Sequence, residues 1–120
     1  MKFLWCTLIV SDIEKSVNFY KDVVGLKVYE RFKAGEHEIC FMGDGETKIE
    51  LLCDKKYTVE KRGEGISLGF EVLSAEKAVD ILKKKGIEAE TKIIQPKPDI
   101  KFFFVRDPDG YRIQFVENIK

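Results

Sequence analysis

The first strand-like segment of the chain, residues 3–10, alternates between two kinds of position. Every second residue in it is apolar: Leu4, Cys6, Leu8 and Val10. The intervening positions are mixed in polarity and include Trp5, the single tryptophan of the sequence. Because successive side chains of a strand point to opposite faces, the pattern predicts one apolar face and one mixed face.

A helical pattern follows this strand. Ser11 and Glu14 have the spacing of a capping box, an apolar stripe follows them, and Gly25 comes after the last turn. The stripe consists of Ile13, Val17 and Tyr20. Three further strand-like runs cover residues 26–33, 37–43 and 46–53, with a tight turn at Gly43-Asp44-Gly45. This part of the chain therefore reads as a βαβββ module.

The same pattern occurs a second time. Val10, Glu14, Lys15, Val17 and Lys21 recur at the same spacing as Val72, Glu76, Lys77, Val79 and Lys83. The second copy predicts a strand over 65–72, a helix capped by Ser74 and ended by Gly86, and strands over 87–94, 101–106 and 111–117. A turn at Asp107-Pro108-Asp109-Gly110 separates the last two strands, and the charged segment 54–64 connects the copies.

These patterns predict an α+β fold with one domain over residues 1–120, made of two βαβββ modules at about 1–53 and 65–120. A module with a single helix leaves one face of its sheet uncovered, so that face must curl around something or meet the other module. We therefore expect two curved, mixed sheets that form a cup.

The repeat also predicts which residues lie under each helix. The helix-side positions are apolar in both copies: Leu4, Cys6, Leu8 and Val10 correspond to Ile66, Leu68, Phe70 and Val72. In the last strand of each copy, Ile49 and Leu51 correspond to Ile113 and Phe115. The Phe102-Phe103-Phe104 run is expected to give one face to the core and the other to the cup.

The opposite side of each sheet, here called the open face, carries the candidate ligand-binding residues. They are Trp5, Thr7, Glu50, Leu52, Ser67, Gly69, Arg112 and Gln114. Trp5, Glu50, Ser67 and Gln114 occupy related positions in the two modules and are expected to converge in the cup. An aromatic wall with a few polar groups is typical of a small-molecule site.

The composition excludes several classes of function. The 21 basic and 21 acidic residues balance, which argues against nucleic acid as a partner. No apolar run approaches the length of a membrane span, and the N-terminus lacks a signal-peptide pattern. Three cysteines without metal-type spacing indicate free thiols in a reducing cytoplasm.

Three motifs make the sequence similar to the vicinal oxygen chelate superfamily, which includes glyoxalase I, bleomycin-resistance proteins and extradiol dioxygenases. They are SDIEKSVNFYKDVVGL after the first strand, KIELL at 48–52 and DPDGYRIQF at 107–115. The resemblance covers essentially the whole chain and implies paired βαβββ modules. It also implies a homodimer, whose modules pair within one chain or across two.

In glyoxalase I-like members of that superfamily, four side chains, usually two His and two Glu, hold a divalent metal ion. The resemblance places this chain's Trp5, Glu50, Ser67 and Gln114 at those positions. Only Glu50 is of the expected type, because indole has no lone pair for a metal and neutral hydroxyl or amide oxygens bind transition ions poorly. The single histidine, His37, lies on another expected strand, and Ile9 stands where close glyoxalase I relatives carry an arginine for the glutathione carboxylate. We therefore expect neither a bound metal nor another cofactor.

Three functional hypotheses follow. In the first, the protein binds a small organic molecule in the cup without a metal, for sequestration or sensing, with Trp5 as a stacking platform. In the second, it is a lyase or isomerase in which Glu50 removes a proton next to a carbonyl while Gln114 and Ser67 polarise the oxygen. In the third, the cup is filled by its own side chains, Trp5 among them, and the protein is structural or binds a partner. Glu50 has its own alternative, an ion pair with Lys48 or Arg112.

Overall fold

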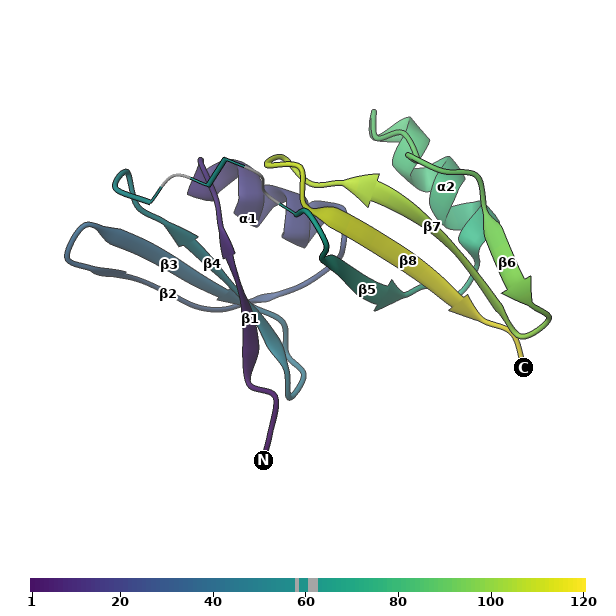
Figure 1. The fold of residues 1–120 in the computed structure, drawn as a ribbon, viewed down its shortest axis with the longest axis horizontal. Helices are drawn as coiled ribbons and strands as arrows, with labels where there is room; N and C mark the ends of the chain where they lie inside the picture. Colours follow the sequence, from purple (N-terminus) through teal and green to yellow (C-terminus); the bar gives the residue numbers. More distant parts are fainter. Residues whose placement is uncertain (58, 61–62) are drawn as a thin grey trace. The chain divides into compact units, whose positions relative to one another are not determined.

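A computed structural model gives the structure of the chain and describes residues 1–57, 59–60 and 63–120 (Figure 1). The chain divides into two compact units, unit 1 over residues 1–62 and unit 2 over residues 63–120. Residues 58 and 61–62 of the expected connector lie outside the described residues.

Unit 1 is a four-stranded mixed sheet with one helix. Its elements are β1 (Trp5–Ile9), α1 (Ile13–Asp22), β2 (Val28–Ala34), β3 (His37–Met42) and β4 (Lys48–Cys53). The strand order is β1-β4-β3-β2; β1 runs parallel to β4, and the other neighbours are antiparallel. α1 packs across β3 and β4 on one face (Figure 1).

Unit 2 repeats this topology. Its elements are β5 (Ser67–Glu71), α2 (Ala75–Lys84), β6 (Ile94–Lys97), β7 (Ile100–Arg106) and β8 (Arg112–Asn118). The strand order is β5-β8-β7-β6, with β5 parallel to β8. Even the register repeats, because Trp5 lies opposite Lys48 in unit 1 and Ser67 lies opposite Arg112 in unit 2. The predicted α+β fold of two βαβββ modules is confirmed.

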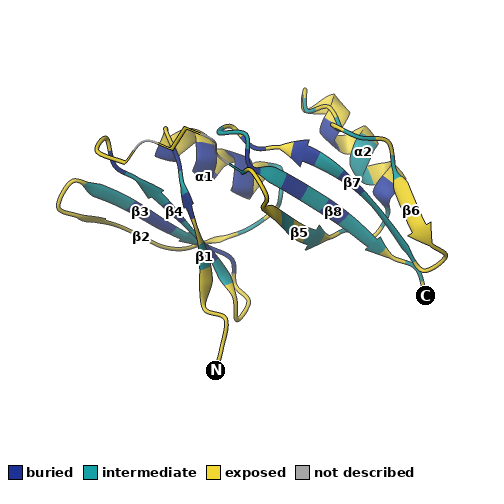
Figure 2. Cartoon of the chain, in the orientation of Figure 1, coloured by how far each residue is buried: buried dark blue, intermediate teal, exposed yellow. Residues whose placement is uncertain are grey.

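The core of each unit lies between the sheet and its helix (Figure 2). The fully buried side chains on this side include Leu8, Met42, Leu51, Phe103 and Ile113. The outer strands β2 and β6 are exposed along their whole lengths. Neither helix of the described residues is long and apolar enough to cross a membrane.

The first strand of each unit is less buried than the alternation predicts. Leu4 and Ile66, expected under the helices, are 54% and 55% exposed. The reason is the placement of the helices: α1 packs mainly on β3 and β4, and α2 on β7 and β8, so burial in β1 reaches Leu8 but not Leu4. Leu4 and Ile66 also lie just before the paired residues of their strands.

The strand predicted over residues 87–94 is wrong, since the paired segment is Ile94–Lys97. The preceding residues follow β7 through mixed contacts instead of a regular ladder. The Glu90 amide donates to the Phe104 carbonyl over 2.7 Å, but the Phe104 amide donates to the Thr91 hydroxyl at 3.3 Å. A side-chain oxygen here takes the place that a backbone carbonyl occupies in a ladder.

The predicted cap of the first helix is also wrong by one residue. Asp12 is the N-cap of α1, and its Oδ1 accepts a hydrogen bond from the Lys15 amide over 3.1 Å. A carboxylate at this position also interacts favourably with the helix dipole. In α2 the predicted cap is confirmed, because Ser74 Oγ accepts from the Lys77 amide at 3.2 Å. Gly86 follows that helix with φ +80°, a conformation that favours glycine.

Replacing Asp12 by Ala is expected to lower the free energy of unfolding by about 1 kcal/mol, because the amide of Lys15 loses its partner. Ser11→Ala is the matched control and is expected to cost less. Urea denaturation followed by circular dichroism measures both. If Ser11→Ala lowered the free energy of unfolding more than Asp12→Ala, Ser11 would be the N-cap, as the sequence predicts, and the assignment of Asp12 would be wrong.

Candidate functional site

The strand register places several of the candidate residues together on the open face of unit 1. Directly opposed residues of neighbouring strands point to the same face of a sheet. Trp5 opposes Lys48, Thr7 opposes Glu50, and Glu50 in turn opposes Phe41. Leu52 follows two residues after Glu50 and shares this face.

A bulge in β2 adds an aromatic ring to this face. The register of β2 against β3 shifts between Val28 and Glu30, so Tyr29 is an extra residue in the strand. The ammonium of Lys48 lies over the Tyr29 ring, 4.3 Å from its centroid, and donates to the Gly45 carbonyl at 3.1 Å. Tyr29 and Lys48 therefore form one side of the site.

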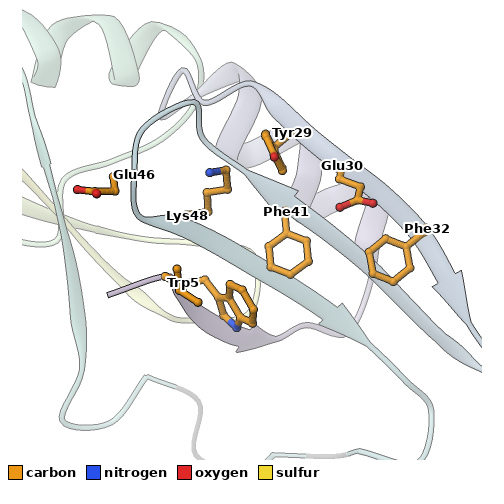
Figure 3. A pocket seen from close by; sticks show the side chains of 8 residues that line it. Trp5, Tyr29, Glu30, Phe32, Phe41, Glu46 and Lys48 are labelled. Atoms are coloured by element: carbon orange, nitrogen blue, oxygen red, sulfur yellow. The ribbon is translucent and has the colours of Figure 1, made fainter. Parts of the chain in front are cut away.

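Together these side chains line a depression that we name the aromatic hollow (Figure 3). Its lining residues are Leu4, Trp5, Tyr29, Glu30, Phe32, Phe41, Glu46 and Lys48, and its volume is about 360 Å³. The rings of Trp5 and Phe41 meet edge to face, with centroids 5.1 Å apart and planes at 70°. Phe32 lies nearly parallel to Phe41, at 6.4 Å and 22°. Trp5 is 47% exposed, so a large part of its indole is free to contact a ligand.

Glu50 lies beside the aromatic hollow and is half-buried. The Thr7 hydroxyl donates a hydrogen bond to Glu50 Oε1 over 2.5 Å, which fixes the orientation of the carboxylate. Lys48, one of the ion-pair partners considered for Glu50, instead contacts Gly45 and the Tyr29 ring. The carboxylate is thus positioned by a neutral donor and not by that cation.

The candidate residues of unit 2 also share an open face. Ser67 opposes Arg112, and Gly69 opposes Gln114. Phe104 opposes Gln114 from the other side, and Phe103 is fully buried, so the Phe run divides between the two faces as predicted. Convergence of the Trp5–Glu50 pair with its counterparts in unit 2 stays a prediction.

The residues that the resemblance to glyoxalase I-like proteins assigns to metal positions are poor metal ligands as a set. In unit 1 the two positions hold an indole, which has no free lone pair, and one carboxylate. In unit 2 they hold a hydroxyl and an amide. Within the described part of the chain, no three side chains of the His, Cys, Asp and Glu types are grouped so that they could hold a metal.

His37 has a structural environment on β3, in keeping with the prediction that it is a strand-surface residue. Its Nδ1 lies 2.7 Å from Oδ2 of the buried Asp54, and its ring stacks on Tyr57 with centroids 5.6 Å apart. These contacts hold the start of the connector against β3.

The buried Cys40 gives no nucleophile. All three cysteines are free thiols, and burial raises the pKa of Cys40. A raised pKa keeps the thiol protonated at neutral pH, whereas the thiolate is the reactive form.

Sequence reasoning missed most of the aromatic hollow. Phe41 follows from the same alternation that identifies Glu50, once it is extended to the strand over residues 37–43. The position of Tyr29 cannot be predicted from this alternation, because the bulge interrupts the alternation of side chains between the two faces of β2.

Comparison with known proteins places these features in a family. Residues 2–115 match the model of the Glyoxalase/Bleomycin resistance protein/Dioxygenase superfamily. Protein YraH of Bacillus subtilis is 35% identical, over 95% of this chain and 96% of its own. A lactoylglutathione lyase of Neisseria meningitidis serogroup B is 31% identical, over 98% of this chain and 91% of its own. The structure of TnmS3, an antibiotic binding protein from Streptomyces, has the same fold with a TM-score of 0.74 and 18% identity, covering 98% of this chain and 96% of the other.

Phe41→Ala is expected to expose Trp5 further, because the Phe41 ring covers one edge of the indole. The single-tryptophan emission should shift to longer wavelength, and stability should fall by about 1–3 kcal/mol, somewhat less than for a fully buried ring. Tyr57→Ala, an exposed aromatic of unit 1 outside the hollow, serves as the control and should leave the emission unchanged. An unchanged emission maximum in Phe41→Ala would contradict this packing.

Proposed function

The chain belongs to the Glyoxalase/Bleomycin resistance protein/Dioxygenase superfamily, and within it we propose a protein that binds a planar, mainly apolar small molecule in the aromatic hollow without a metal ion. The observation that carries the proposal is the half-exposed Trp5 in an aromatic-lined depression. The resemblance described above assigns Trp5 to a position where metal-dependent members carry a ligand side chain.

The size and lining of the hollow support a small organic ligand. A volume of about 360 Å³ falls within the range of about 300–1,000 Å³ that is usual for such sites. The open hollow beside Trp5 also counts against a site filled by the protein's own side chains.

The geometry of the rings favours a flat ligand. Phe32 and Phe41 are inclined by only 22°, so together they make an extended apolar wall. The indole of Trp5 stands at 70° to Phe41 and forms a second wall. An aromatic ligand in the corner that the two walls form can stack on one ring while its edge meets the other, the two arrangements that aromatic pairs prefer.

Polar groups at the margin of the hollow would orient such a ligand. Lys48 lies over the Tyr29 ring, and Glu30 and Glu46 complete the lining. The fold is compatible with this use, since TnmS3 is an antibiotic binding protein. A homodimer and a cytoplasmic location stay predictions, and the proposal needs neither.

Binding is tested with 2-naphthol, a planar bicyclic probe, and with its saturated, non-planar analogue decahydro-2-naphthol. The single tryptophan gives one indole N–H resonance, which should shift saturably with 2-naphthol and not with the analogue. At a probe concentration ~100 times the Kd, the free energy of unfolding should rise by about 2.7 kcal/mol. The stabilisation should disappear in Trp5→Ala and persist in Tyr57→Ala. Equal stabilisation of Trp5→Ala would exclude the aromatic hollow as the binding site.

A lyase or isomerase is the second candidate function, favoured by the lactoylglutathione lyase relative and by the position of Glu50. In this reaction type Glu50 removes a proton from a hydroxyl-bearing carbon next to a carbonyl, and the electron pair of the C–H bond moves to form an enediolate. The carboxylic acid then returns the proton to the former carbonyl carbon while the hydroxyl proton passes to the other oxygen, so that the carbonyl and the hydroxyl exchange places. The Thr7 hydroxyl would hold the carboxylate in place for both transfers.

Glu50→Gln tests this second candidate, because an amide has nearly the shape of the carboxylate but cannot accept the proton. Turnover of lactoylglutathione is expected to fall by at least about 100-fold, while affinity for 2-naphthol changes little. Thr7→Val is the companion variant and should lower kcat by a smaller factor. Equal turnover in Glu50→Gln and the wild type would rule Glu50 out as the base.

A further inference from the structure

The open face of unit 2 carries a second arrangement of polar side chains, which is independent of Trp5. Arg112 in β8 lies opposite Ser67 in β5 on one side and Arg106 in β7 on the other. Gln114 follows two residues later on the same face of β8. Two guanidinium groups, a hydroxyl and an amide therefore share one region of this face.

The charges of Arg106, Arg112 and their shared partner Glu90 do not cancel. Glu90 is the carboxylate that both arginines contact. Arg106 donates hydrogen bonds to both carboxylate oxygens of Glu90, from Nε to Oε2 and from Nη2 to Oε1, the latter over 3.1 Å. That hydrogen-bonded pairing holds the pKa of Glu90 below its usual range, so the carboxylate is ionised at neutral pH. Two positive charges and one negative charge leave one positive charge in excess.

The excess charge is located on Arg112. Arg106 is fully engaged, because its Nη1 also donates to the Gly110 carbonyl at 2.9 Å. Arg112 reaches Glu90 only through Nε, at 3.3 Å from Oε1. Within the described residues its Nη1 and Nη2 make no hydrogen bond, and its guanidinium lies 3.8 Å from the centroid of the Phe104 ring. A guanidinium held over a ring with both terminal nitrogens free is preorganised to bind a planar anion.

The neighbouring groups supply further donors. Among the described residues, the side chains of Ser67 and Gln114 have no hydrogen-bond partner, so both are available to a ligand. Gly69, between them on the face, has no side chain to cover the region, and a Cβ built there would lie 3.5 Å from Gln114 Oε1. Gln114 thus extends across to β5 over the glycine, in the row next to the one that contains Ser67 and Arg112.

We infer that the open face of unit 2 binds the carboxylate of a small organic acid, with the terminal nitrogens of Arg112 as the anchor and Ser67 and Gln114 as flanking donors. The fork of donors on a guanidinium matches the two oxygens of a carboxylate. A single excess positive charge matches a monoanion better than a phosphate dianion. In unit 2, the two positions that correspond to metal-ligand positions of related enzymes thus flank a fixed organic cation.

The experiment is a titration of the full chain with benzoate, followed by nuclear magnetic resonance at the Arg112 Nε–H group and at the amides of Ser67 and Gln114. Benzamide, which has the same ring and no charge, and inorganic phosphate are the comparison probes. Benzoate is expected to shift these resonances saturably. Benzamide is expected to leave the Arg112 Nε–H resonance unchanged, and phosphate is expected to bind more weakly than benzoate. The indole resonance of Trp5 is followed in the same spectra, so this site and the aromatic hollow succeed or fail separately.

Variants assign the effect to the guanidinium. Arg112→Gln should lower benzoate affinity by about ten- to a hundredfold, and Ser67→Ala by a few-fold, as expected for losing charged and neutral hydrogen bonds. Lys97→Gln, which removes an exposed cation of β6, is the matched control and should leave affinity unchanged. Equal affinity in Arg112→Gln and wild type, equal shifts with benzamide, or tighter binding of phosphate would each overturn the inference.

Discussion

The parallel pairing of the first and last strand of each unit is the constraint on which the candidate sites depend. In unit 1 it sets Thr7 opposite Glu50, and in unit 2 it sets Gly69 opposite Gln114. Because side chains alternate between the two faces, a slip of one residue would turn every candidate residue into the core. The apolar helix-side residues Leu51 and Ile113, both fully buried, hold this register in place.

With the register fixed, the two open faces present related but different chemistry. Lys48 and Arg112 are equivalent in the repeat, and each lies over an aromatic ring of its own unit. Unit 1 combines this cation with an aromatic surface that includes Trp5, whereas unit 2 combines it with polar donors. The same scaffold thus presents an aromatic surface in one unit and a cluster of polar donors in the other.

Much of this architecture could be predicted from the sequence, because the βαβββ pattern occurs twice, so each element expected in one copy has a counterpart in the other. The assignment of Trp5, Thr7 and Glu50 to one face needs only the period of two along a strand. The remaining features depend on local irregularities that do not repeat along a strand. The bulge at Tyr29 adds a ring to the hollow, and the Thr91 hydroxyl replaces a ladder carbonyl beside β7. The packing of α1 over β3 and β4, which leaves Leu4 exposed, is set by tertiary contacts that a strand pattern does not contain.

The central claim is that the residues at the metal positions of the family serve ligand binding directly. The most direct measurement is calorimetric titration of 2-naphthol into protein dialysed against a chelator, and into the same protein after addition of Ni²⁺ or Zn²⁺. Our account predicts the same Kd in both samples and no stoichiometric metal uptake by elemental analysis. One equivalent of tightly held metal, or binding that appears only after metal is added, would contradict it.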